Sequence, residues 1–106
     1  MAERWTAEQQ KAVEKERNYW LEKFFLGRWH GEYVILQNVE IEEEEGHSAI
    51  KLTFLDEDDE KVKAIYIGKL TLDQLSELIG KKTRAFVKMP DKTAINYLDI
   101  GDRFWS

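Results

Sequence analysis

Residues 61–89 read KVKAIYIGKLTLDQLSELIGKKTRAFVKM, and this stretch decides the fold. Lys61 to Ile67 has the composition of a strand, and Gly68 interrupts it. The segment Thr71-Leu72-Asp73-Gln74 has the spacing of a capping box, so it predicts a short helix that ends at Gly80. Thr83 to Met89 then predicts another strand. A short helix therefore stands between two strands.

The flanking segments add three more strands. A long strand is predicted first. Its first half is apolar on both faces and its second half on one face only, which indicates a bent strand shared between two sheet layers. The next strand places Ile50, Leu52 and Phe54 on one face. A tight connection follows Met89 and leads into the last strand. The predicted segments are the strand Glu32–Glu44, the turn 43–47, the strand Ser48–Leu55, the acidic turn 56–60, the connection 90–92 and the strand Thr93–Asp99.

The order of these elements predicts the architecture. Three strands, a short helix and two strands within residues 32–100 are typical of a small Greek-key barrel of the OB type. The predicted class is therefore mainly β (α+β), with a five-stranded OB-like barrel. The alternative is an α+β roll of the cystatin type, in which the sheet after the first helix would be an uninterrupted meander.

A long helix is predicted before the barrel, over residues 6–26. Thr6 and Gln9 have capping-box spacing, and Gly27 is a natural residue to end a helix. Val13, Trp20 and Phe24 share one face. The second half is apolar nearly all round and needs to be covered, so we expect it to pack on the barrel and plug an open end. The first half is expected to project into solvent or to meet a partner, and residues 29–31 to form a linker.

The composition fits one soluble domain. The 106 residues are 42% hydrophobic and 12% aromatic, enough for one core, and we expect a single domain over 1–106 with a tail at 101–106. Cysteine is absent, which excludes disulfides and thiol chemistry. The start, MAERWTAEQQ, lacks an apolar signal region, and no window approaches 18 apolar residues. A cytoplasmic protein without membrane attachment is expected.

Charge is strongly segregated along the chain. The net charge is −5, yet residues 32–60 carry eleven acids and one base, whereas residues 61–92 carry eight bases and three acids. One part of the surface is therefore expected to be acidic and another basic. Solvated loops and lysines that protect sheet edges would also give this pattern.

No motif in the sequence indicates catalysis. The two histidines, His30 and His47, lie in a linker and in a glutamate-rich turn, outside any nucleophile or metalloprotease pattern. Adjacent glutamates in a turn are normally solvated, and the spacing around His47 matches no known metal cage. We expect a protein that is not an enzyme and has no cofactor and no metal.

Single-stranded nucleic acid is the first candidate partner. Binding needs a cationic groove with aromatic faces on which bases stack, and OB barrels normally use their second and third strands together with the first and last hairpin loops. Phe54 is expected to point into the core. Tyr66 lies on the same side of its strand as Val62 and Ala64, which is also the side expected to face the core. The candidate residues are Lys51, Lys61, Lys63, Tyr66, Arg84, Lys88, Lys92 and Tyr97.

One part of the chain resembles a family. The stretch LSELIGKKTRAFV at residues 75–87, followed by residues 92–100, is similar to part of certain phage-encoded single-stranded-DNA-binding or recombination-accessory proteins. In those proteins a short helix ends in a Leu-Leu-Gly-Lys-like turn, and a Lys-Thr-x-x-x-Asn-like segment forms the last strand. The resemblance covers about a third of the chain and implies an OB barrel that binds single-stranded DNA without catalysis.

A protein partner is the second candidate. Tryptophan is enriched in interface hot spots, and a glutamate-rich surface can imitate phosphate. The chain would then be an acidic adaptor or inhibitor, for example a phage protein that blocks a host nuclease or defence complex, and it could form a homo-oligomer. The candidate residues are Trp5, Glu42, Glu43, Glu44, Glu45, Phe104 and Trp105.

Overall fold

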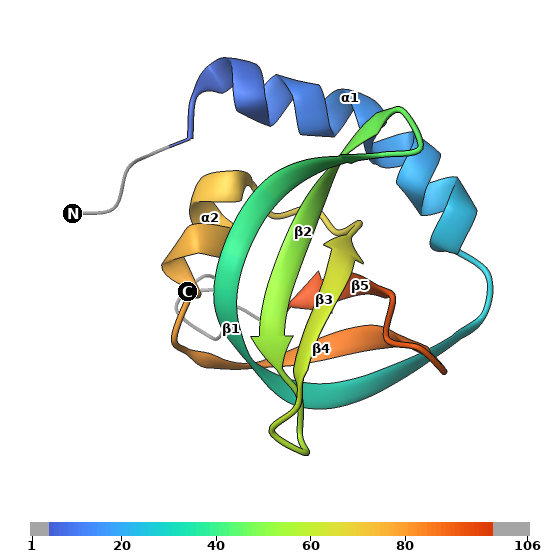
Figure 1. Cartoon of the computed structure of the whole chain (residues 1–106), viewed down its shortest axis with the longest axis vertical. Helices are drawn as coiled ribbons and strands as arrows, with labels where there is room; N and C mark the ends of the chain where they lie inside the picture. Colours follow the sequence, from blue (N-terminus) through green and yellow to red (C-terminus); the bar gives the residue numbers. More distant parts are fainter. Residues whose placement is uncertain (1–4, 99–106) are drawn as a thin grey trace, which may run out of the picture.

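The computed structural model describes residues 5–98, which form an α+β fold with two helices and five strands (Figure 1). A long N-terminal helix precedes the first three strands, and a short helix separates the third strand from the fourth. The elements are α1 (Ala7–Phe24), β1 (Arg28–Glu44), β2 (His47–Leu55), β3 (Lys61–Tyr66), α2 (Leu72–Glu77), β4 (Lys82–Met89) and β5 (Ala94–Leu98).

The five strands form one mixed sheet that closes in a ring. Hydrogen-bonded neighbours follow the order β1-β2-β3-β5-β4, and β4 pairs with β1 to complete the circuit. All pairs are antiparallel except β3 and β5, which are parallel through Ile65 opposite Ala94 and Tyr66 opposite Ile95. The predicted short helix between the third and fourth strands is confirmed as α2, although it ends at Glu77 rather than near Gly80.

The long strand β1 pairs with two neighbouring strands, as its apolar sequence pattern predicted. Residues 28–35 pair with β4, and residues 35–44 pair with β2. A bulge between Leu36 and Asn38 shifts the register, so Val34 and Leu36 point inward before it and Val39 after it. The predicted linker over 29–31 is wrong. Those residues begin β1, because β4 supplies the hydrogen bonds that the local sequence cannot reveal.

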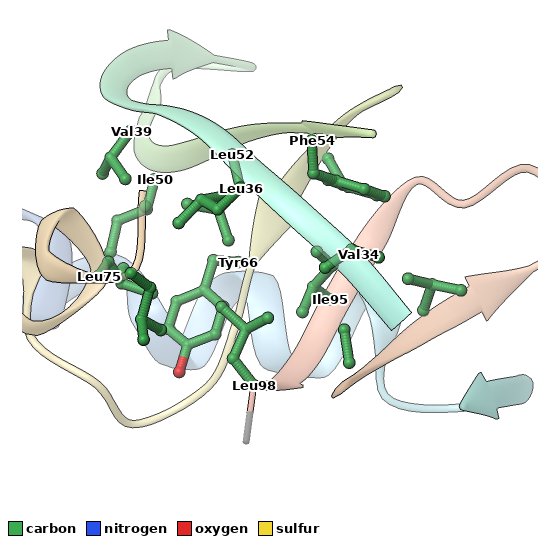
Figure 2. Close-up of a cluster of buried hydrophobic side chains, with 14 of the residues drawn as sticks. Val34, Leu36, Val39, Ile50, Leu52, Phe54, Tyr66, Leu75, Ile95 and Leu98 are labelled. Carbon is green, nitrogen blue, oxygen red and sulfur yellow. The ribbon is translucent and has the colours of Figure 1, made fainter. Parts of the chain in front are cut away.

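The core fills the ring. Leu52 and Phe54 are fully buried, which confirms the predicted inward face of β2. The apolar side of α2 contributes Leu75 at one end of this core, where Figure 2 shows it beside Ile50 and Tyr66. Helix α2 therefore covers that end of the ring.

An ion cluster lies beyond the other end of β2. Lys92 donates to Asp56 Oδ2 at 2.8 Å and lies 3.2 Å from both carboxylate oxygens of Glu32, which points inward from β1 and is buried. The backbone amides of Asp58 and Glu60 also donate to Asp56 Oδ1, each at 2.9 Å. The cluster thereby joins the β2–β3 turn and the β4–β5 turn to β1.

Helix α1 begins as predicted, with both hydrogen bonds of the Thr6 capping box present, and it ends at Phe24, two residues before the predicted end. Its second half packs on the sheet, as expected. It does not plug an end of the ring, however, but runs along the outside beside β2 (Figure 1). Its first half does not project either, since Gln10 Oε1 accepts a hydrogen bond from the Leu72 amide at 2.8 Å and Val13 is buried in the core. A helix next to α2 could not be foreseen from local sequence.

Candidate nucleic-acid interface

The outer surface of β2 and β3, where an OB barrel normally binds, is covered at one end by α1. Trp20 packs on the outward side chains of Ala49 in β2 and Ile65 in β3 and on Ile67, the residue after β3. Its Nε1–H donates to the Ser48 carbonyl at 2.8 Å, and the residue is only 3% exposed. This part of the expected surface is therefore closed by the protein's own helix.

The β1–β2 turn holds the second half of α1 in place. Glu45 and Gly46 form a two-residue turn in which both φ angles are positive, the geometry of a type I′ hairpin. Glu45 pairs with Lys23 and accepts a hydrogen bond from the Tyr19 hydroxyl at 2.9 Å. Both contacts lower the pKa of the Glu45 carboxyl, and the bond from Lys23 has the larger effect. The Tyr19 ring also stacks on His47 with centroids 3.6 Å apart.

Two lysines of the predicted basic track are neutralised by acids of β1. Lys63 Nζ lies 2.8 Å from Glu40 and also contacts Glu42, and these hydrogen bonds raise the pKa of Lys63 and lower that of Glu42. Lys51 pairs with Glu44 at 2.9 Å. A third predicted cation, Lys92, belongs to the ion cluster described above. Phosphate would have to compete with carboxylates at each of these positions.

Three further candidates have distinct environments. Lys88 Nζ donates to the carbonyls of Phe24, at 3.1 Å, and Leu26, so it caps the end of α1. Tyr66 is 5% exposed and accepts a hydrogen bond from the Leu70 amide, and burial raises its pKa to about 12. Its ring is part of the core and offers no face for stacking. Lys61 is exposed and forms no ion pair with any residue from 5 to 98.

A different surface combines exposed rings with cations. We call it the aromatic face, and it is the outer side of the first half of β1 together with β4 and β5. Cross-strand register places Tyr33 opposite Arg84 and Phe86 opposite Tyr97. The aromatic face comprises the rings of Trp29, Tyr33, Phe86 and Tyr97 and the cations Lys82, Arg84 and Lys88.

Each cation of the aromatic face lies over a ring. Lys82 Nζ is 5.8 Å from the Tyr33 centroid, and Arg84 Cζ is 5.9 Å from the Phe86 centroid. The Phe86 and Tyr97 rings are 5.6 Å apart and inclined by 41°. Tyr33 is 49% exposed and Tyr97 39%, so both present ring surface to solvent.

Gly31 leaves room for neighbouring side chains at the centre of this face. It lies opposite Phe86 on β1. A Cβ atom at this position would come within 2.9 Å of Arg84 Nη2 and 3.0 Å of Phe86 Cε1. The absence of a side chain therefore lets the guanidinium of Arg84 reach across β1 and lie close to the sheet.

Acids border one side of the aromatic face. A cleft of about 170 Å³ lies between Tyr33 and Lys82 on one side and the β2–β3 turn on the other, and Glu57 and Asp59 line it. Glu57 Oε2 also accepts the Tyr33 amide at 3.2 Å. These acids would repel a polyanion on this side of the aromatic face.

The predicted protein-contact residues are mostly engaged within the chain. Trp5 packs against the core, and its Nε1–H donates to Ser76 Oγ at 2.8 Å. Glu42, Glu44 and Glu45 have the partners given above, whereas Glu43 is exposed. Phe104 and Trp105 lie outside the described residues. The two most exposed large apolar side chains among residues 5–98 lie instead at the end of α1, where Phe25 is 63% and Leu26 81% exposed.

Among residues 5–98, no group of three or more metal-ligating side chains comes together, and neither helix is long and apolar enough to span a membrane. Comparison of the chain with protein families, with curated proteins and with solved structures found no match.

Sequence reasoning missed three rings of the aromatic face: Trp29, Tyr33 and Phe86. A signal for Phe86 was present in the alternation of Lys82, Arg84, Phe86 and Lys88, which puts all four on one side of a strand. The inward positions Thr83, Ala85 and Val87 are buried, as this alternation requires.

Proposed function

We propose that this protein binds single-stranded nucleic acid without catalysis and that the aromatic face is the binding surface. The observation that carries the proposal is the pair of half-exposed tyrosines, Tyr33 and Tyr97, on a sheet surface whose cations Lys82 and Arg84 form no ion pair with any residue from 5 to 98. Exposed rings beside unpaired cations are what single-strand binding requires.

Single strands fit this surface better than a duplex. Each base stacked on an aromatic side chain contributes about 1–3 kcal/mol, and an unpaired base offers both of its faces. A duplex hides its bases and binds largely through phosphates, which needs many cations. The net charge of −5 and the acids beside Tyr33 work against that mode.

We further propose that the fold is an OB-type Greek-key barrel of the kind found in phage single-strand-binding and recombination-accessory proteins. The strand order, the parallel β3–β5 pair and the position of α2 support this assignment. The proposed binding surface differs from the usual one of such barrels, because α1 covers part of the outer surface of β2 and β3.

Fluorescence anisotropy with a labelled oligothymidylate of about 15 nucleotides, which spans the largest site sizes of single OB folds, tests the proposal. Tyr33→Ala and Tyr97→Ala should each weaken binding about 5- to 150-fold, the equivalent of 1–3 kcal/mol per stacked base. Lys63→Ala is the matched control, because its ammonium group is exposed but already paired with Glu40 and Glu42. Absence of binding by the unmodified chain at low ionic strength would reject the function.

Contact with a protein is the second candidate function, and the exposed side chains of Phe25 and Leu26 favour it. Large apolar side chains at this exposure, beside the partly buried Phe24 and Trp29, are typical of contact surfaces. Sedimentation of the chain over a range of concentrations, compared with the double variant Phe25→Ser/Leu26→Ser, tests whether this end of α1 mediates self-association. Identical monomeric behaviour of both proteins would remove the support for a homo-oligomer.

A further inference from the structure

A cleft of about 190 Å³ separates α1 from the connection between β3 and α2. Helix α1 contributes Gln10, Arg17 and Trp20 to its wall, and the connection contributes Gly68 and Lys69. The cleft lies on the α1 side of the ring, away from the aromatic face. It is smaller than the pockets of drug-sized ligands, which occupy about 300–1,000 Å³.

Arg17 has an unusual environment in this cleft. Its Nε atom is buried and has no hydrogen-bond partner, and no carboxylate among residues 5–98 pairs with its guanidinium. A guanidinium group stays charged at all physiological pH values, and a buried donor without a partner is costly. Such a group in a native fold requires an explanation, and one explanation is an acceptor that comes from outside the chain.

The acids nearest in sequence to Arg17 are committed elsewhere. Glu16 lies 2.9 Å from His47 Nδ1. Glu14 lines the cleft, and its Oε2 accepts a hydrogen bond from Gln10 Nε2 at 2.6 Å. The cleft therefore contains one carboxylate that is held by an amide and one guanidinium that is not paired.

Two more polar groups face the same space. Lys69 is exposed and makes no ion pair with any residue in the described part of the chain. The Tyr66 hydroxyl accepts from the Leu70 amide at 3.0 Å, which leaves its own hydrogen available to a ligand oxygen. Burial raises the pKa of Tyr66 to about 12, and the charge of Arg17 opposes that rise, consistent with a guanidinium close to the hydroxyl.

We propose that this cleft binds a small oxyanion, either a phosphate or a carboxylate group, through Arg17 and Lys69. The planar guanidinium matches two oxygens of such a group at once, and the ammonium group adds a second positive charge. The Tyr66 hydroxyl donates a further hydrogen bond, and Trp20 forms an apolar wall. Glu14 acts against the anion and limits its affinity.

Isothermal titration of the full chain with inorganic phosphate and with acetate, each against chloride at equal ionic strength, tests the site. At least one of the two oxyanions should bind saturably. Arg17→Met should weaken that binding by about tenfold or more, the scale of one charge-assisted bidentate contact, and Lys69→Met should weaken it less. Glu14→Gln should strengthen it, because a like charge is removed. Lys11→Met on the exposed side of α1 is the matched control and should change nothing.

Nuclear magnetic resonance provides a readout that does not depend on the folding of a variant. The Trp20 indole N–H resonance of the unmodified chain should shift with anion concentration, and the Trp29 indole resonance should not, because Trp20 lines the cleft and Trp29 does not. Absence of any Trp20 shift with both anions, or undiminished affinity in folded Arg17→Met, would overturn the proposal. Neither result depends on oligonucleotide binding, so this site and the aromatic face can fail separately.

Discussion

Replacement of Trp20 by alanine tests whether α1 is an integral part of the folded ring. A tryptophan side chain buries up to about 250 Å², and Trp20 is only 3% exposed. At about 25 cal/mol per Å², its burial contributes at most about 6 kcal/mol. The hydrogen bond to the Ser48 carbonyl adds about 1 kcal/mol. Large-to-small core substitutions of tryptophan cost about 3–5 kcal/mol, and we expect Trp20→Ala to fall in that range.

Urea denaturation followed by circular dichroism measures this change. A domain of this size has a total stability of about 5–15 kcal/mol, so the midpoint should fall markedly. Trp20→Phe should cost less, since it keeps most of the apolar contact with Ile65 and Ile67 and loses mainly the hydrogen bond. Phe25→Ala, an aromatic truncation at an exposed position just after the same helix, is the matched control, with an expected change within about 0.5 kcal/mol.

A loss below about 1 kcal/mol for Trp20→Ala would refute this reasoning, because so small a value belongs to surface substitutions. A lower slope of free energy against urea in the variant would have another meaning. It would show that less surface is exposed on unfolding, as expected if α1 had already left the ring.

Three shorter predictions concern other parts of the molecule. Gly68→Ala should destabilise the fold by about 1–3 kcal/mol in urea denaturation, because the added Cβ atom would lie 2.3 Å from the hydroxyl oxygen of Tyr66. Gly31→Val should displace the Arg84 guanidinium and weaken oligonucleotide binding in anisotropy titrations while the circular dichroism spectrum is unchanged. The ion cluster should make stability fall at both pH extremes. The hydrogen bond from Lys92 lowers the pKa of Asp56 below 3.8, so the stabilisation from the Asp56 carboxylate is lost as the pH falls below this value. Burial opposes the charge of Lys92, but its carboxylate partners raise its pKa above 10.5, so the stabilisation from the Lys92 ammonium group is lost as the pH rises above that value. Unchanged urea midpoints across both ranges would contradict the last prediction.

The fold could be predicted from sequence because its signals are local. Two capping boxes, at Thr6 and Thr71, fix where the helices begin, and alternation fixes the inward residues of β2. The start of β1 at Arg28 could not be predicted in this way. Nothing in the segment of residues 28–31 alternates clearly, and its strand conformation depends on hydrogen bonds to β4, almost sixty residues later in the chain.

The sequence also contains a signal for the position of the second half of α1. The end of strand β3 and the residue after it read Ala64-Ile65-Tyr66-Ile67, which is apolar on both faces. A strand segment of this kind needs cover on both faces, and the ring interior supplies only one. Trp20 on α1 provides the second cover. The apolar second half of α1 therefore packs against the end of β3 that is apolar on both faces.

The ring also explains what becomes of the charge segregation in the sequence. It places the second half of β1 beside β2, with β3 on the far side of β2, and the long side chains of Glu42 and Glu44 neutralise Lys63 and Lys51. Strand β4 has different neighbours: the first half of β1, whose only acid points inward, and β5, which has no charged residue. The cations of β4 therefore keep an uncompensated positive charge on the aromatic face.

This distribution predicts how binding of a single strand should depend on salt. The logarithm of the binding constant falls by about 0.7 per contacted phosphate for each unit in the logarithm of salt concentration. Two or three cations on the aromatic face give a slope of about −1.4 to −2.1, whereas the six cations of the track predicted from sequence would give about −4. Anisotropy titrations at several potassium chloride concentrations measure this slope. A value near −4 would refute the aromatic face as the binding surface, because its three cations cannot account for that many phosphate contacts.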